Sequence, residues 1–147
     1  KAPSVNLSSL YDDILVEEDN IRAAISFAKA SITTSGTASL ECAVLDTPQI
    51  VCYKLSRISG TIASHLNKSP FISMANLVVG KKIVPELIQK DVNKKEIVSA
   101  LQPLLQNSKE RRKMLEAFNG VRRSLGLPGA YARAAEAIIK RTTHAKP

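Results

Sequence analysis

The residues with the clearest chemical potential occupy positions 32–41, whose sequence is ITTSGTASLE. β-branched residues lead there into Ser35 and Gly36, and a glycine turn at the carboxyl end of a strand lets the backbone approach a phosphate closely. The amides of Gly36, Thr37 and Ala38 then lie at the start of a helix, where the helix dipole favours an anion. The pattern predicts a site for a nucleotide phosphate, and a capped turn without a ligand stays open as the alternative.

Glu41 lies one turn into the helix that this pattern predicts. Its carboxylate could accept hydrogen bonds from hydroxyl groups such as those of a ribose. From the residues alone, a carboxylate on the helix surface that binds nothing is the alternative for Glu41.

The sequence offers little for metal or disulfide chemistry. Cys42 and Cys52 have no CxxC spacing, and His65 and His144 lie far apart with no cluster of other ligands around them. We therefore expect no metal site, no cofactor and two reduced, buried thiols of the kind found in cytosolic proteins.

Composition predicts a folded domain with uneven charge. The chain has 147 residues, of which 44% are hydrophobic and 23% charged, and its net charge is +8. Residues 1–53 hold three bases against seven acids, and residues 54–147 hold 18 bases against six acids. The basic part fits an anionic ligand, an anionic membrane surface or an ordinary solvated surface. Aromatic residues make up only 4% of the chain, which argues against a nucleic-acid partner.

The elements that must position these residues alternate between helix and strand. Periodicity predicts a helix with apolar positions 21, 24, 25 and 28, capped by Asp19 or Asn20, and then a strand at residues 30–34. A second helix, with the stripe Leu40, Ala43 and Val44, leads to a buried strand at residues 49–53. This order predicts an α/β fold with the two strands parallel and adjacent.

Beyond Tyr53 the pattern is mostly helical. Residues 55–66 carry one apolar face, Glu86 follows Pro85 in an expected first helical turn, and Asn93 with Glu96 forms a capping-box pattern. Asn76 alone would be interpreted as a turn former before an apolar run. The charged residues 111–113 favour a solvated face. Two further apolar stripes are predicted at residues 114, 118, 121 and 125 and at residues 131, 135 and 138.

Four blocks together resemble a known family. They are SGTASLE at residues 35–41, PQIVCYK at 48–54, SMANLVVGK at 73–81 and VPELIQ at 84–89. In content, order and spacing they resemble the carboxy-terminal half of lipid-A-disaccharide synthases, a family similar to the GT-B glycosyltransferases. The resemblance implies part of a Rossmann-like donor-binding domain. Residues 1–106 would be its α/β region, incomplete at the start, and residues 107–147 its carboxy-terminal helices.

The resemblance also implies roles for individual residues. Ser35, Gly36 and Thr37 would hold the diphosphate of UDP, Glu41 its ribose, and Asn76 would approach the donor from the next loop. Less definite roles fall to the remaining motif positions, Tyr53, Lys54, Glu86 and Gln89. The family's general base would lie in a domain that this sequence lacks, so we expect no turnover by this chain alone.

The activity implied is transfer of diacylglucosamine from UDP to a lipid monosaccharide phosphate in lipid A biosynthesis. Such a protein would be cytoplasmic and peripheral to the inner membrane, with an anionic membrane surface as a further partner. Neither the residues nor the resemblance fixes the oligomeric state, and a homodimer stays open. A non-catalytic basic helical module that binds RNA or a protein partner is the alternative function.

Overall fold

A small parallel sheet organises the chain. The computed structural model describes residues 14–54 and 70–144. Strands β1 (Ser31–Thr33), β2 (Gln49–Tyr53) and β3 (Glu86–Ile88) lie in the order β1-β2-β3, and both pairs are parallel. The prediction that the first two strands are adjacent and parallel is confirmed. The predicted helix at residues 55–66 falls outside the described residues.

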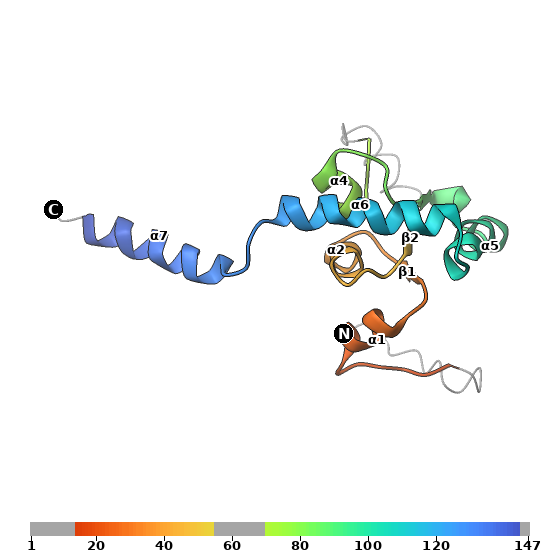
Figure 1. The fold of residues 1–147 in the computed structure, drawn as a ribbon, viewed down its shortest axis with the longest axis horizontal. Coiled ribbons are helices and arrows are strands. Elements are labelled where there is room, and N and C mark those ends of the chain that lie inside the picture. The colour runs from red at the N-terminus through yellow and green to blue at the C-terminus, as the bar shows by residue number, and fades with distance from the viewer. Residues whose placement is uncertain (1–13, 55–69, 145–147) are drawn as a thin grey trace.

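The core forms where helices cover this sheet. Helices α2 (Thr37–Val44) and α4 (Met74–Val79) flank the long helix α6 (Lys109–Leu125) in Figure 1, and each of the three contacts the other two. Phe118, Ile50 and Val51 are almost completely buried between them. Burial of each such side chain contributes about 1.5–3 kcal/mol, so α6 is part of the same core as the sheet.

The buried face of α2 differs from the predicted stripe. Its buried residues are Ser39, Cys42 and Ala43, while Val44 is 44% exposed. Of the predicted stripe, Ala43 is buried in the core and Leu40 packs against it, so the prediction was wrong only for Val44. Ser39 and Cys42 are buried because α2 meets both the sheet and α6, and small side chains allow this close approach.

Helix α1 (Ile21–Phe27) begins as predicted but is capped differently. The side chain of Asn20, its N-cap residue, makes no capping hydrogen bond. Instead, Glu17 Oε1 accepts hydrogen bonds from the amides of Asp19 (2.9 Å) and Asn20 (2.7 Å). These bonds lower the pKa of the Glu17 carboxyl, because they favour its charged form.

The segment after α4 contains the largest departure from the predicted elements. Glu86 begins strand β3, where Val51 is its register partner, and does not lie in a helix. Pairing with β2 decides this, because Pro85 fixes only its own φ angle and a strand fits that angle as well as a helix start does. A short 3₁₀ turn, η2 (Gln89–Asp91), follows β3 directly.

Helix α5 (Lys94–Leu101) follows its predicted start. Asn93 caps α5, and its side chain accepts a hydrogen bond from the amide of Glu96 at 3.1 Å. The helix then tightens into the 3₁₀ segment η3 (Gln102–Leu105), which contains Pro103. Leu104 on η3 is buried in the core.

Helix α6 buries three of its four predicted apolar positions. Met114, Phe118 and Val121 are buried, whereas Leu125 at the end of the helix is 45% exposed. In the charged run at its start, Arg111 is half-buried and donates to the carbonyl of Leu104. The prediction of a solvated face therefore fails for Arg111, which ties α6 to η3.

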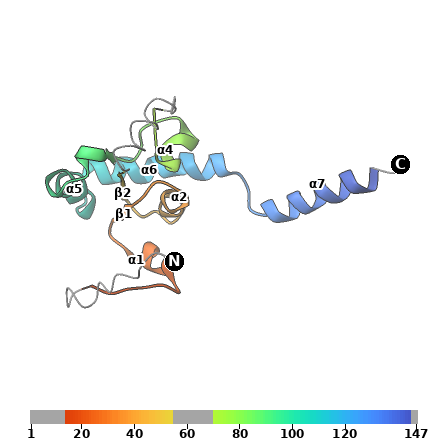
Figure 2. The ribbon, with the colours of Figure 1, turned by 180° about the vertical axis from the view of Figure 1, so that it is seen from behind.

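Helix α7 (Ala130–His144) extends away from the rest of the described chain (Figure 2). Tyr131 on its predicted apolar stripe is 94% exposed, and Ile138 is 64% exposed. The stripe is present but packs on nothing in the described chain. Within residues 14–54 and 70–144, no helix combines the length and the apolar character that crossing a membrane requires.

Candidate functional site

The carboxyl ends of the three parallel strands lie along one edge of the sheet. Ser35 and Gly36 follow β1, Tyr53 ends β2, and Gln89 follows β3. Ligands of open α/β sheets gather at this edge. The fold therefore brings four of the predicted site residues to the edge where chemistry is expected.

Gly36 sets the entry into α2. Its backbone angles, φ 140° and ψ −161°, lie in a region that is essentially restricted to glycine. Among the described residues, no atom beyond Gly36 and its two chain neighbours lies within 4 Å of the position that a Cβ at Gly36 would take, so this part of the structure leaves the space in front of the turn open. The need for glycine here is conformational.

The amino end of α2 has unpaired donors. Its N-cap, Gly36, offers no side chain, and Ser39 uses both its amide and its hydroxyl on the carbonyl of Gly36, the hydroxyl at 2.9 Å. Within the described residues, the amides of Thr37 and Ala38 have no hydrogen-bond partner. Together with the helix dipole, these amides can meet an anion.

Glu41 lies one turn further along the same helix. It is half-buried and lines a groove of about 350 Å³ between α1, α2 and the end of α6, together with Thr37 and Arg22. Among the described residues its carboxylate forms no ion pair. An unpaired carboxylate in a groove next to Thr37 suits the hydroxyl groups of a ligand.

Ser35 is held by another part of the chain. Its hydroxyl donates to the carbonyl oxygen of Ile72 at 2.8 Å. A hydroxyl has a single proton to donate, and a phosphate only accepts. Ser35 therefore cannot donate to a phosphate while this bond is formed.

Glu86 lies behind the same segment. Its Oε1 atom accepts hydrogen bonds from the amide of Ser73 at 2.8 Å, from Asn76 Nδ2 at 2.8 Å and from the amide of Ile72 at 3.1 Å. Its Oε2 atom accepts from the Ile72 amide as well. The carboxylate thus fixes the start of α4.

Asn76 is fully buried, and all its polar capacity is used. Its Nδ2 group donates to the carbonyl of Val84 at 3.0 Å as well as to Glu86, and its Oδ1 atom accepts from the amides of Ile83 (2.7 Å) and Val84 (2.9 Å). Two donors and two acceptor sites are the whole inventory of an amide side chain. In this structure Asn76 has no group left for a ligand, and it lies in α4 and not in a turn.

The last three predicted residues lie at or just after strand ends. Tyr53 is half-buried, whereas Lys54 is exposed. Gln89 has φ 53°, the left-handed region that non-glycine residues rarely adopt. Such backbone strain at a strand end is typical of functional loops.

Residues that sequence reasoning missed hold the site in place. Gln49 is fully buried, donates from Nε2 to the carbonyl of Ser39 at 2.7 Å and accepts from the Thr33 hydroxyl at 3.1 Å. Ser73, also fully buried, caps α4 by accepting from the amide of Asn76. A serine before the apolar run at residues 74–79 is a signal that could have located this helix start.

Cys42 is buried as predicted, whereas Cys52 is only half-buried. Burial raises the pKa of Cys42 on α2 and that of Cys52 on β2, because desolvation disfavours the thiolate. Both cysteines are free. In the described part of the chain, no three histidine, cysteine or acidic residues gather as metal ligands would.

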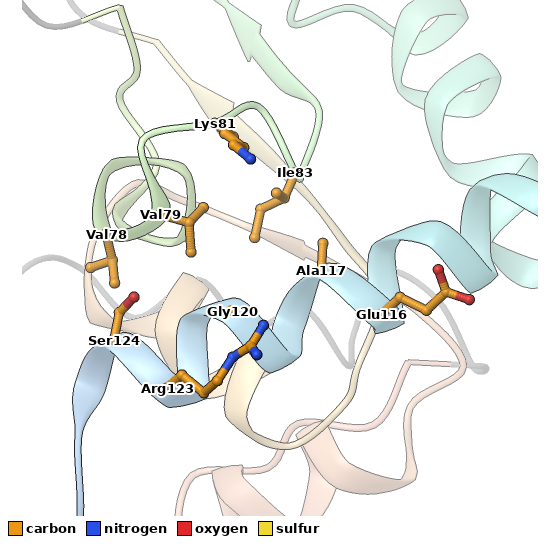
Figure 3. Close-up of a pocket in the computed structure, with 9 residues that line it drawn as sticks. All are labelled: Val78, Val79, Lys81, Ile83, Glu116, Ala117, Gly120, Arg123 and Ser124. Carbon is orange, nitrogen blue, oxygen red and sulfur yellow. The ribbon is translucent and has the colours of Figure 1, made fainter.

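A hollow of about 440 Å³ lies elsewhere, between the end of α4 and α6 (Figure 3). Lys81 and Ile83 face it from the loop, and Ala117 and Gly120 face it from α6. None of the predicted site residues lines it. The hollow and the predicted site are therefore separate surfaces.

Comparison with known proteins connects these features to a family. The family model described as lipid-A-disaccharide synthetase matches residues 6–136. The lipid-A-disaccharide synthase of Acidobacterium capsulatum is 40% identical over 76% of this chain and 28% of its own length. That of Syntrophus aciditrophicus is 41% identical over 76% and 29%, and that of Synechocystis 36% identical over 86% and 32%.

The match covers most of this chain but spans only about a third of the length of these relatives. It includes the glycine turn, α2, the strands and α4, which are the elements that build the site. By sequence and by these elements, the chain belongs to the lipid-A-disaccharide synthase family.

Proposed function

We propose that this chain is the donor-binding part of a lipid-A-disaccharide synthase and that it binds UDP-diacylglucosamine at the amino end of α2. The observation that carries the proposal is the open helix start at Gly36, on the sheet edge where ligands of such folds gather. In this proposal the diphosphate meets the amides of Thr37 and Ala38.

The proposed ribose contact is Glu41. Its carboxylate lines the groove that begins beside Thr37 and lies on the same helix as the open amides. A carboxylate that accepts a hydrogen bond from a hydroxyl group makes a charge-assisted bond, worth about 1.5–3 kcal/mol. Tyr53 and Gln89 are proposed to line the same edge from the ends of β2 and β3.

The proposed reaction is transfer of the donor sugar from UDP to the acceptor. The amides and the dipole of α2 stabilise the negative charge that develops on the departing UDP. The acceptor, a lipid monosaccharide phosphate, attacks the donor sugar through a hydroxyl group. We assign the base that removes its proton to the part of the relatives that this chain does not span. Both substrates carry acyl chains, so the protein works at the cytoplasmic face of the inner membrane in this proposal.

The first test is titration of UDP into the 147-residue chain and its Glu41→Gln variant by calorimetry. We expect Glu41→Gln to weaken UDP binding about tenfold or more and to leave the melting temperature unchanged, because Gln has the same size without the charge. The matched control is Glu136→Gln on the exposed helix α7, which removes one carboxylate far from the groove.

Two outcomes would contradict the proposal. Equal UDP affinity for the wild type and Glu41→Gln would make the carboxylate a bystander. A chain stabilised by heparin in a strongly salt-dependent manner, but not by UDP, would favour the basic module that binds RNA.

A further inference from the structure

The glycine turn and strand β3 are joined through the backbone of residues 72 and 73. Ile72 offers its carbonyl to the Ser35 hydroxyl at 2.8 Å and its amide to the Glu86 carboxylate at 3.1 Å. One residue thus links the turn before α2 to a side chain from β3. No other hydrogen bond in the described chain connects the side chain of Ser35 to the rest of the fold.

The Glu86 end of this link is rigid. Its carboxylate accepts from two successive amides and from Asn76, whose own Oδ1 accepts from two amides just before β3. Asn76 and Ser73 are fully buried. Charge-assisted bonds to a carboxylate are about twice as strong as neutral ones, so the position of Ile72 is closely defined.

We infer that Glu86 is a positioning residue for the anion site, acting through the Ile72 carbonyl and the Ser35 hydroxyl on the turn at Gly36. This inference rests on the proposed function for the identity of the anion, UDP. It gives Glu86 and Ser35 a role distinct from direct ligand contact. They hold the amides of Thr37 and Ala38 in the orientation that a diphosphate requires.

The physical reason is preorganisation. Gly36 has no side chain to fix its conformation, and its φ of 140° is one of several that glycine adopts readily. A turn that must be ordered by the ligand loses affinity, because the ordering entropy is then lost at binding. A turn already fixed by Ser35 avoids that loss.

The test compares the wild type with Glu86→Gln, Ser35→Ala and the double variant. Gln keeps the shape of Glu but has no charge, and an NH₂ group takes the place of one carboxylate oxygen. With the amide oxygen at the position of Oε1, the bond from the Ile72 amide to Oε2 is lost and the remaining bonds are no longer charge-assisted. We expect each single variant to bind UDP about five- to tenfold more weakly in calorimetry. The double variant should bind UDP no more weakly than the more affected single variant, because both changes interrupt the same connection from Glu86 through Ile72 to Ser35.

Hydrogen exchange gives a second readout that needs no ligand. In Glu86→Gln and in Ser35→Ala, the amide of Ser39, which donates to the carbonyl of Gly36, should exchange about tenfold faster, because the turn opens more often. The matched control is Asn93→Ala, which removes the cap of α5 and lowers the melting temperature without touching the link. It should change neither UDP affinity nor exchange at the turn.

Unchanged UDP affinity and unchanged exchange in the single variants would overturn the inference, as would losses that multiply in the double variant. Failure of the wild type to bind UDP contradicts the proposed function instead, and the exchange experiment still decides the role of Glu86. If Glu86→Gln fails to fold, Ser35→Ala alone decides, because it removes only one hydrogen bond. Unchanged hydrogen exchange at the turn in Ser35→Ala would contradict the inference that this hydrogen bond holds the turn.

Discussion

Helices α2 and α4 begin beside the same sheet but have opposite chemistry at their amino ends. At α4, the Ser73 side chain accepts from the amide of Asn76, and the Glu86 carboxylate accepts from the amides of Ile72 and Ser73. At α2, the N-cap is Gly36 and no side chain caps the helix. One helix start is occupied by the chain's own carboxylate, and the other is open.

The difference shows what makes a helix start available to a ligand. The dipole and the free amides are general properties of helix starts. At α4 they are used internally, where they fix the loop that the Ser35 hydroxyl contacts. The hydrogen-bonded start of α4 therefore helps to position the open start of α2.

The largest effect is expected for Asn76→Ala, which disrupts the hydrogen-bonded start of α4. The change removes a fully buried side chain and leaves the amides of Ile83 and Val84 and the carbonyl of Val84 without partners. Each unsatisfied buried group costs about 1–3 kcal/mol, so we expect a loss of at least about 3 kcal/mol in the free energy of unfolding, measured with urea.

Asn119→Ala is the control, because Asn119 is exposed and accepts one hydrogen bond from Arg122 on its own helix. It should cost less than about 0.5 kcal/mol. A loss below about 1 kcal/mol in Asn76→Ala would mean that the buried network at α4 contributes little to the fold.

A smaller effect is expected at the open helix start, in Gly36→Ala. The backbone angles of Gly36 are unfavourable for any residue with a Cβ, so we expect a loss of about 1–3 kcal/mol of stability and weaker UDP binding. Thermal unfolding and calorimetric titration measure the two effects.

Gly120→Ala is the opposite case. Gly120 lies inside α6, and its added Cβ would meet Val79 Cγ1 at an ordinary 3.5 Å. Alanine is the better helix former by about 1 kcal/mol, so this variant should gain stability. If Gly36→Ala were as stable as the wild type, the turn would have adjusted and the open helix start would not depend on glycine.

The smallest effect concerns the thiol on the buried face of α2. Burial raises the pKa of Cys42, so at a given pH less of this thiol is ionised than in the unfolded chain. We expect iodoacetamide to modify the half-buried Cys52 before Cys42, with mass spectrometry identifying the site. Cys42 reacting as fast as Cys52 would show that α2 leaves the sheet often.

The same shift sets a pH dependence of stability. The thiol of Cys42 holds its proton more tightly in the folded chain than in the unfolded chain. This contribution is fully present below the pKa of the unfolded thiol and decreases as the pH rises above it. Chemical unfolding of the wild type and Cys42→Ser across that range is the measurement.

Local patterns predicted those elements whose neighbours agree with their own preferences. The β-branched residues around Ile32 and the run ending at Tyr53 form parallel strands as expected, and Asn93 caps its helix. The patterns failed where a distant partner decides the outcome. Val44 and Leu125 fit an apolar stripe but are partly exposed, and Glu86 pairs as a strand because β2 lies beside it.

The candidate site likewise contains some residues that local sequence predicts and others whose contribution depends on distant partners. The glycine turn and Glu41 could be predicted, because the requirement for glycine and the position one turn into a helix are local properties of residues 35–41. The contribution of Ile72 could not, since it acts through its backbone and any residue offers the same carbonyl and amide.

The sequence by itself determined the α/β order, the glycine turn at Gly36 and the family to which the chain belongs. Only the tertiary structure decided which polar side chains form their hydrogen bonds within the protein and are therefore not available to a ligand. Asn76 and Glu86 stand in motifs that follow the glycine turn in the sequence, yet their side chains bond to each other and to backbone groups of residues 72–84. The reason is that a buried polar atom must find a partner, and the three-dimensional fold alone fixes which partner lies within hydrogen-bond distance.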